Sequence, residues 1–217
     1  MNNIDSIIFD LDGTLWSTLN STVEVSKEIK KRHSDIVEDM STEVIKSAMG
    51  CTFEETAKKY YGYLDKETRE RYTKEAIQEN TKYLMKHGGT LYNGVKEVIK
   101  LLSKNYKLYI VSNCIEGYIE SFLETSNLKD YFSDFENNGR TGLEKGENIK
   151  LLIKRNHLSN PIYVGDTDKD REAAEEAKIP FIYATYGFGA VEKYNNKIDN
   201  IYDLLTILKI KNTKNEF

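Results

Sequence analysis

Short apolar segments alternate with amphipathic helical segments from residue 95 onward, and this alternation limits the possible folds more than any other feature of the sequence. An apolar segment at 7–9 adds one more candidate strand. The later candidate strands lie at 107–111, 131–136, 161–164, 180–184 and, at a sheet edge, 197–201. Strands separated by helices pair in parallel through right-handed crossovers and carry helices on both faces. We therefore predict an α/β protein whose Rossmann-like, three-layer core contains a mainly parallel sheet.

Residues 17–87 show a helical pattern without strands. Amphipathic segments lie at 22–33, 41–49, 53–61 and 65–86; Gly50 and Gly62 divide the last three, and a Gly-Gly pair at 88–89 ends the block. A chain of 217 residues is long enough for two structural units. We therefore predict a core formed by residues 1–16 and 88–217, with an all-helical insert at 17–87.

The composition argues against several classes of partner. Lys and Arg number 31 and Asp and Glu number 35, so the net charge of -4 gives no overall reason to bind nucleic acid or an anionic membrane. No run of about twenty apolar residues is present, so we expect neither a membrane span nor an export segment. Two cysteines are too few for a disulfide framework, and we expect a reducing cytoplasm.

The first candidate strand ends in two carboxylates, Asp10 and Asp12, and is followed by Gly13. Residues two apart on a strand point to the same side, so both acids can face one pocket. One carboxylate can attack an electrophile while the other moves a proton, and two nearby anions favour a raised pKa or a bound cation. The alternative interpretation is a buried strand that runs into an ordinary acidic turn.

A second acidic run follows the candidate strand at 161–164 and contains Asp166, Asp168 and Asp170. Asp166 and Asp170 beside Asp10 would form an oxygen-rich site of the kind that Mg²⁺ prefers. We expect Asp168 to face solvent. The alternative is an acidic helix N-terminus, because carboxylates are favoured at that end of the helix dipole.

Two further positions suit phosphate binding. Ser112 and Asn113 follow the strand at 107–111, where a hydroxyl and free backbone N–H groups can hold a phosphate; an ordinary helix cap is the alternative. Lys145 can offset the charge of a phosphoryl group, although a lysine is more often a solvated surface residue. Lys150 and Lys154 are substitutes if Lys145 points away.

The order of these motifs resembles that of the haloacid dehalogenase-like (HAD) hydrolase superfamily over nearly the whole chain. The motifs are Asp-X-Asp-Gly-Thr from Asp10, Ser-Asn at 112–113, Lys145 before a helix, and Gly-Asp-X-X-X-Asp ending at Asp170. The helical insert corresponds to a cap domain after the first motif, as in the phosphoglycolate phosphatase-like members. The resemblance implies that Asp10 is a nucleophile and that Asp12 is a general acid and base.

The resemblance also implies the other roles. Ser112 and Lys145 would hold phosphoryl oxygens, while Asp10, the backbone carbonyl of Asp12, and Asp166 would bind Mg²⁺ with support from Asp170. Asp12 argues against the dehalogenase branch, which lacks this acid.

The sequence departs from the relatives at two places. Trp16 is followed by Ser17-Thr18 where relatives often have Asp-Ser, and Lys145 is followed by Gly146 where they often have proline. Neither change removes a catalytic group. The departures therefore concern which subfamily the chain resembles more than the chemistry that the resemblance implies.

These observations predict a Mg²⁺-dependent phosphatase that hydrolyses a small phosphorylated metabolite through an aspartyl-phosphate. A sugar phosphomutase and a non-catalytic, aspartate-phosphorylated signalling module are the alternatives. Gly50, Cys51 and Thr52, at a break between helices of the insert, are the candidates for substrate contact. The protein is expected to be a monomer or a homodimer.

Overall fold

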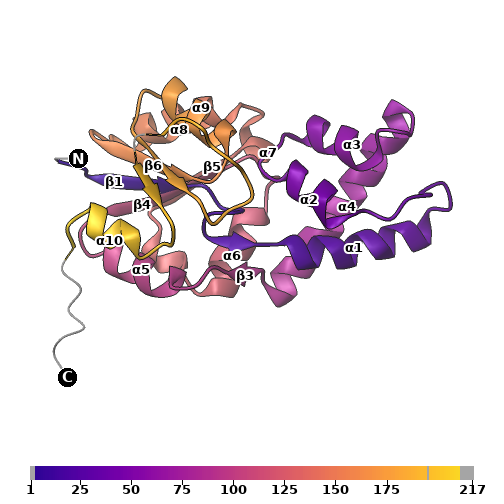
Figure 1. Ribbon diagram of the computed structural model, residues 1–217, viewed down its shortest axis with the longest axis horizontal. Coiled ribbons are helices and arrows are strands. Elements are labelled where there is room, and N and C mark those ends of the chain that lie inside the picture. The colour runs from indigo at the N-terminus through magenta and orange to yellow at the C-terminus, as the bar shows by residue number, and fades with distance from the viewer. Residues whose placement is uncertain (1–2, 195, 211–217) are drawn as a thin grey trace.

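The computed structural model describes residues 3–194 and 196–210, and a parallel sheet forms its centre (Figure 1). Six strands pair in parallel in the order β5-β4-β1-β6-β7-β8. Their bounds are β1 Ser6–Phe9, β4 Lys107–Ser112, β5 Asp134–Asn137, β6 Pro161–Gly165, β7 Phe181–Ala184 and β8 Asn196–Ile198. The prediction of a mainly parallel sheet is confirmed.

Helices cover both faces of this sheet, because successive side chains of its buried strands point to opposite sides. Ile7 and Phe9 of β1 pack on one face and Ile8 packs on the other. The first face carries α5 (Val95–Leu102), α6 (Tyr118–Ser126) and α10 (Asp203–Ile207), and the second carries α8 (Lys145–Asn156) and α9 (Asp168–Glu176). Figure 1 shows the two helical layers above and below the sheet, as predicted for a three-layer core.

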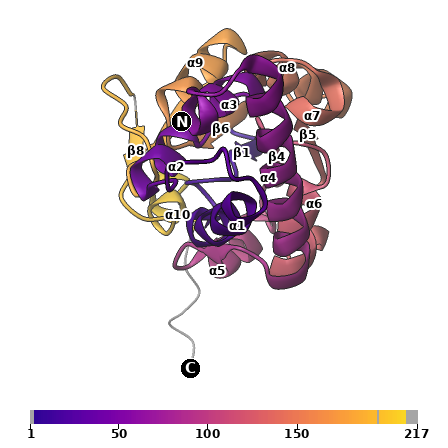
Figure 2. The same cartoon turned by 90° about the vertical axis from the view of Figure 1, so that its right-hand side faces the viewer.

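Four helices lie beyond the sheet: α1 Leu19–Arg32, α2 Thr42–Ala48, α3 Phe53–Tyr61 and α4 Lys66–His87. We call them the helical segment. Val25, Ile29, Tyr61 and Tyr72 form its own small apolar core. Seen from this end of the molecule, α1, α2 and α4 lie in front of the strands (Figure 2).

A short antiparallel ribbon connects the helical segment to the sheet. The chain leaves through β2 (Trp16–Ser17) and returns through β3 (Thr90–Leu91). Trp16 is buried there against the edge of Tyr118. A Cβ at Gly89 would lie 2.6 Å from the indole ring, so the chain returns in direct contact with Trp16.

The sequence missed several short elements. Strands β2 and β3 have two residues each, which is too short for a periodic pattern. The strand predicted at 131–136 begins at Asp134, because Lys129–Tyr131 forms a 3₁₀ turn. The four-residue helix α7 (Asn138–Thr141) was also missed.

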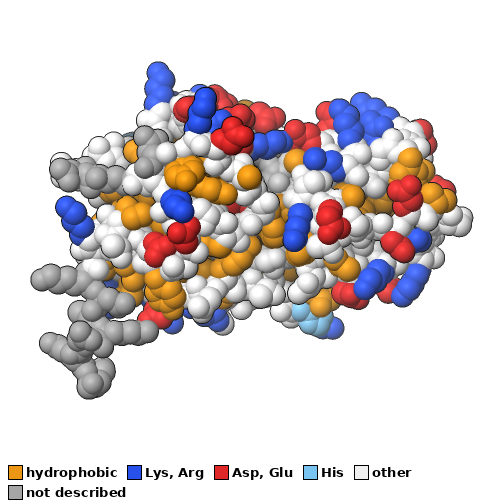
Figure 3. Space-filling view, in the orientation of Figure 1, with side chains coloured by type: hydrophobic (Ala, Val, Ile, Leu, Met, Phe, Trp, Pro, Cys, Tyr) orange, Lys and Arg blue, Asp and Glu red, His pale blue; other side chains and the backbone are white. Residues whose placement is uncertain are grey.

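The surface carries both signs of charge. Basic and acidic side chains are interspersed on the face shown in Figure 3. Within residues 3–194 and 196–210, no helix is long and apolar enough to cross a membrane.

Candidate active site

The polar residues predicted from the sequence emerge at one edge of the sheet. Phe9 lies opposite both Ile110 and Val164 in the strand register, so the next residues of β1, β4 and β6 leave the sheet together. Asp10 follows β1 directly, Ser112 is the last residue of β4, and Asp166 follows β6. This edge is formed by the carboxyl ends of the parallel strands, where α/β proteins bind ligands.

Gly13 turns the chain sharply beside the acidic residues. Its φ of +90° lies in the region that favours glycine, and its N–H donates to the carbonyl of Trp16 over 2.9 Å. A Cβ at this position would lie 2.2 Å from Oδ2 of Asp166. The turn after β1 therefore requires glycine for its conformation and for its close approach to Asp166. Asp12 lies in this turn and not on the strand. The turn therefore positions its side chain, and not the alternation of side chains along a strand that the sequence predicted.

Three buried carboxylates surround one lysine. Oxygen atoms of Asp10, Asp166 and Asp170 lie within 4.8 Å of one another. Lys145, the first residue of α8, donates from Nζ to Asp10 Oδ1 over 2.8 Å and to Asp170 Oδ1 over 2.6 Å. Its side chain is only 4 % exposed, so Lys145 points inward and is not a solvated surface lysine.

Asp170 is held by the start of α9. Its Oδ2 accepts hydrogen bonds from the backbone N–H groups of Asp166 and Thr167, and the Thr167 side chain accepts from the N–H of Asp170 in a capping box. The acidic residues of this run therefore do lie at a helix N-terminus, as the alternative interpretation expected. Asp170 also belongs to the buried cluster, so the two interpretations hold together.

Asp166 has one carboxylate oxygen without a hydrogen-bond donor. Its Oδ2 accepts from the N–H of Phe188 over 2.7 Å, whereas its Oδ1 is buried and has no partner among the described residues. A buried carboxylate oxygen normally has a donor or a cation beside it. The lone Oδ1 and the all-oxygen donor set therefore fit a hard cation such as Mg²⁺.

Burial sets the protonation behaviour of the cluster. It raises the pKa of Asp10 to about 7 although Lys145 opposes the shift, and it raises the pKa of Asp166 well above its usual range. Burial opposes the charge of Lys145, but Asp10 and Asp170 hold the pKa of its ammonium well above the usual range. The lysine is thus a fixed positive charge at the base of the site.

Asp12 has separate partners. Thr18 Oγ1 donates to Asp12 Oδ1 over 2.9 Å, and the Tyr118 hydroxyl donates to the same oxygen over 3.1 Å. Removal from bulk water raises the pKa of Asp12 to about 6, although both hydrogen bonds favour the ionised form. The sequence did not single out Thr18 and Tyr118, because residues 100 positions apart reveal their contact only in the fold.

Ser112 does not cap a helix. The next helix, α6, begins at Tyr118 and has Gly117 at its N-cap, so a loop separates it from β4 and the helix-cap alternative is wrong. Asn113 donates from Nδ2 to the carbonyl of Gly50 over 3.2 Å and so joins the sheet edge to the helical segment.

A cavity lies between this edge and the helical segment. Asp10, Asp12, Ser112 and Asn113 line it from the sheet, and Gly50 and Cys51 line it from the loop between α2 and α3. Thr52 does not line the cavity; its hydroxyl accepts from the N–H of Glu55 at the start of α3. Of the three residues proposed for substrate contact, two therefore lie on the cavity wall.

The remaining candidates lie outside the cluster. Asp168 is exposed and pairs with Arg171, as expected for a residue that faces solvent. Lys150 pairs with Glu147 and Glu176 at the surface. Lys154 is also exposed, so neither substitute lysine replaces Lys145.

An ion pair joins the helical segment to α9. Lys169 Nζ contacts Glu55 Oε2, and this hydrogen bond lowers the pKa of Glu55 to about 2. With the bond from Asn113 to Gly50, it gives two polar contacts across the rim of the cavity.

Comparison with known proteins agrees with this geometry. A family model described as haloacid dehalogenase-like hydrolase matches residues 7–184. A phosphoglycolate phosphatase of Aquifex aeolicus is 26% identical over 196 residues, which cover 84% of this chain and 85% of the relative.

Solved structures share the fold at lower identity. A structure described as a predicted phosphoglycolate phosphatase from Haemophilus somnus has a TM-score of 0.83 at 21% identity and covers 96% of this chain and 99% of that one. A haloacid dehalogenase-like family hydrolase of Streptococcus pneumoniae has a TM-score of 0.81 at 22% identity, with 96% and 100% coverage.

Proposed function

Because the chain belongs to the haloacid dehalogenase-like hydrolase family, we propose that it is a phosphatase that hydrolyses small phosphomonoesters through an aspartyl-phosphate on Asp10. The contact of Lys145 with Asp10 is the observation that carries this proposal. Lys145 donates a hydrogen bond to Oδ1 of Asp10, while Oδ2 of Asp10 accepts no hydrogen bond within the described part of the chain. Asp10 lines the cavity, so one carboxylate oxygen is oriented and the other is available for attack.

In the first step, the Asp10 oxygen forms a bond to phosphorus as the bond from phosphorus to the alcohol oxygen breaks. Asp12 gives its proton to that leaving oxygen. A pKa of about 6 keeps part of Asp12 protonated near neutral pH, whereas an ordinary aspartate is almost fully ionised there. Lys145 offsets the charge that gathers on the phosphoryl group.

In the second step, Asp12 takes a proton from water, whose oxygen forms a bond to phosphorus. The bond between phosphorus and Asp10 then breaks, and inorganic phosphate leaves. Asp12 thus returns to its protonated form and Asp10 returns to its ionised form.

Asp10, Asp166 and the backbone carbonyl of Asp12 would hold Mg²⁺, and Asp170 would orient Lys145 beside them. The bound cation supplies charge neutralisation to the phosphoryl oxygens. Ser112 lies at the end of β4 on the cavity wall, where its hydroxyl can donate to a phosphoryl oxygen.

We further propose that residues 17–87 act as a cap domain over this site. The cavity between the helical segment and the sheet edge supports this role, as does the narrow two-stranded connection at Trp16. Closure would exclude bulk water from the phosphoryl group.

The test is phosphate release from p-nitrophenyl phosphate and from a panel of sugar and small alkyl phosphates, with Mg²⁺ and with a chelator. We expect turnover that needs Mg²⁺ and is lost in Asp10→Asn. Undiminished turnover by Asp10→Asn would refute the nucleophile. Conversion of a sugar phosphate to its positional isomer without free phosphate would indicate the mutase instead, and stable phosphorylation without turnover would indicate the signalling module.

A further inference from the structure

The wall of the cavity is largely apolar beyond its two catalytic carboxylates. The centre of a water molecule can move through about 120 Å³ of this space. The apolar part of the wall comes mainly from the helical segment and includes Val25, Met49, Phe53, Tyr60, Ile77 and Ile115. A substrate whose phosphate lies at Asp10 would place its alcohol portion against these side chains.

The cavity wall offers no cation to a second anionic group. None of the described residues that line it is Lys, Arg or His. Lys145 is bound to Asp10 and Asp170. Lys169 is bound to Glu55, and its Nζ lies 3.9 Å from the sulfur of Cys51. Both lysines line a neighbouring groove, which shares Asn113 with the cavity, and not the cavity itself.

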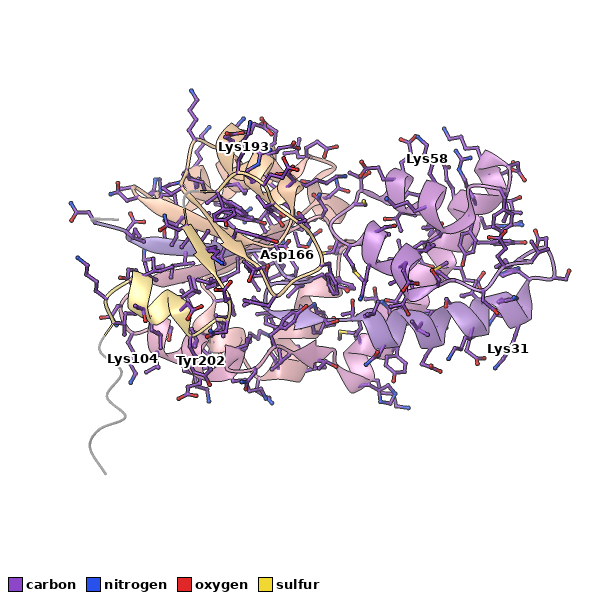
Figure 4. The ribbon with its side chains drawn as sticks, viewed as in Figure 1. Lys31, Lys58, Lys104, Asp166, Lys193 and Tyr202 are labelled. Atoms are coloured by element: carbon purple, nitrogen blue, oxygen red, sulfur yellow. The ribbon has the colours of Figure 1, made fainter. Side chains whose placement is uncertain are left out.

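Two lysines of the helical segment lie away from the cavity. Figure 4 shows Lys31 and Lys58 at the outer surface of this segment, away from Asp166. Each forms an ion pair with a glutamate of its own helix.

The N-terminus of α3 is also occupied. Phe53, its first residue, lines the cavity, so backbone N–H groups at this end could in principle attract an anion. However, the Glu55 carboxylate accepts from the N–H of Thr52 and the Thr52 hydroxyl accepts from the N–H of Glu55. The capping box thus uses the N–H groups of Thr52 and Glu55 and adds the negative charge of Glu55 beside this helix end, which disfavours a substrate carboxylate there.

The polar groups that remain on the wall are uncharged. Asn80 and Asn113 line the cavity, and the side-chain oxygen of each is buried without a hydrogen-bond donor among the described residues. Buried amide oxygens of this kind suit a hydroxyl or N–H group of a ligand.

We infer that this site takes phosphomonoesters of uncharged, largely apolar alcohols that carry a hydrogen-bond donor, and that it discriminates against esters with a second anionic group, including phosphoglycolate. A carboxylate in this cavity would lose water, gain no cation and lie near the carboxylate of Asp12. The inference rests on the proposed phosphatase activity and defines its substrate class. It distinguishes the substrate of this chain from phosphoglycolate, which the name of its 26% identical relative gives.

Two matched esters test the effect of a second negative charge on the substrate. Phosphoglycolate and its carboxamide, 2-(phosphonooxy)acetamide, have nearly the same size and differ in the negative charge. We expect kcat/KM to be about 100-fold higher for the amide, which corresponds to about 2.7 kcal/mol at 1.36 kcal/mol per tenfold change. A second comparison, benzyl phosphate against methyl phosphate, tests the apolar wall, and we expect benzyl phosphate to be favoured by at least about tenfold.

A single added cation should change the preference. Met49 lies on the cavity wall and is only partly buried, so Met49→Lys introduces an ammonium of similar length. We expect this variant to reduce the amide preference by about tenfold or more. Met85→Lys is the matched control, because Met85 is 50% exposed on α4 and does not line the cavity. It should leave the preference unchanged, and thermal unfolding should show that both variants are folded.

The outcomes separate this inference from the proposed function. If the protein hydrolyses phosphoglycolate as well as or better than the amide, the inference is wrong while the phosphatase proposal stands. Equal kcat/KM values for benzyl and methyl phosphate would overturn the inferred preference for apolar alcohols. If neither these esters nor p-nitrophenyl phosphate is hydrolysed, the proposed function itself has failed.

Discussion

Replacing Lys145 by methionine removes the only basic side chain that contacts the buried carboxylates of Asp10 and Asp170 among the described residues. The side chains of these two acids are 3% and 1% exposed, so bulk water solvates them only weakly. Removing one partner of a buried ion pair costs about 3–5 kcal/mol, because the other charge stays buried. We expect Lys145→Met to lose about this much free energy of unfolding at pH 8 without Mg²⁺, a large part of the stability of a typical domain.

The loss should depend on pH in a defined direction. Burial already raises the pKa of Asp10 to about 7 with the lysine present, and removal of Lys145 raises it further. The folded variant then binds a proton that the unfolded chain, with an ordinary aspartate pKa, does not bind. Stability of the variant therefore rises as pH falls from 8 to 6, by up to about 1.4 kcal/mol per pH unit for one proton.

Urea unfolding, followed by the fluorescence of the single tryptophan, Trp16, measures the free energy of unfolding of each variant at each pH. Lys150→Met is the matched control, because Lys150 lies on the same helix and its ion pairs are at the surface. It should lose far less stability than Lys145→Met, and this small loss relative to the unchanged protein should not vary with pH. Equal losses in the two variants, or a Lys145→Met variant that weakens as pH falls to 6, would show that Lys145 does not neutralise buried charge on Asp10 and Asp170.

Three further predictions follow from the site. Asp12→Asn should lower kcat/KM for alkyl phosphates by about 10²–10⁴-fold and kcat/KM for p-nitrophenyl phosphate much less, because p-nitrophenolate leaves without a proton and kcat/KM reports only the steps up to the aspartyl-phosphate; steady-state kinetics check this, and equal losses in kcat/KM would contradict it. With an alkyl ester and saturating Mg²⁺, which would hold Asp10 ionised, the rate should fall as pH rises above about 6, where Asp12 loses its proton. Tyr118→Phe should move this fall to higher pH because Tyr118 stabilises the ionised form of Asp12; an unmoved pH profile would count against the role of Tyr118. Mg²⁺ at about 100 times its Kd should raise the free energy of unfolding by about 2.7 kcal/mol, and Asp166→Asn should abolish this gain; an undiminished gain would place the cation elsewhere.

Much of the site could be predicted because it depends on local sequence. Asp10, Ser112 and Asp166 end or follow separate strands, and parallel pairing alone brings such positions to one edge. Membership of the family and the parallel sheet are confirmed. The division at 17–87 and the catalytic roles stay proposals.

Other features could not be predicted because they depend on packing between distant elements. The bonds of Asp12 to Thr18 and Tyr118 require α6 to lie against the turn after β1. Whether Thr52 faced the cavity depended on the first turn of α3, where the capping box uses its hydroxyl. The part of the cavity wall that carries no charged side chain likewise arises from four helices whose individual sequences are rich in Lys and Glu.

The most direct test of the account is to identify the phosphorylated residue during turnover. The protein is mixed with p-nitrophenyl phosphate and Mg²⁺, quenched in acid within the first turnovers and digested, and the peptides are examined by mass spectrometry. We expect one phosphoryl group on Asp10, absent from Asp10→Asn and removed by hydroxylamine, which cleaves acyl phosphates. Steady turnover without any phosphorylated peptide, or with the phosphoryl group on another residue, would contradict the account.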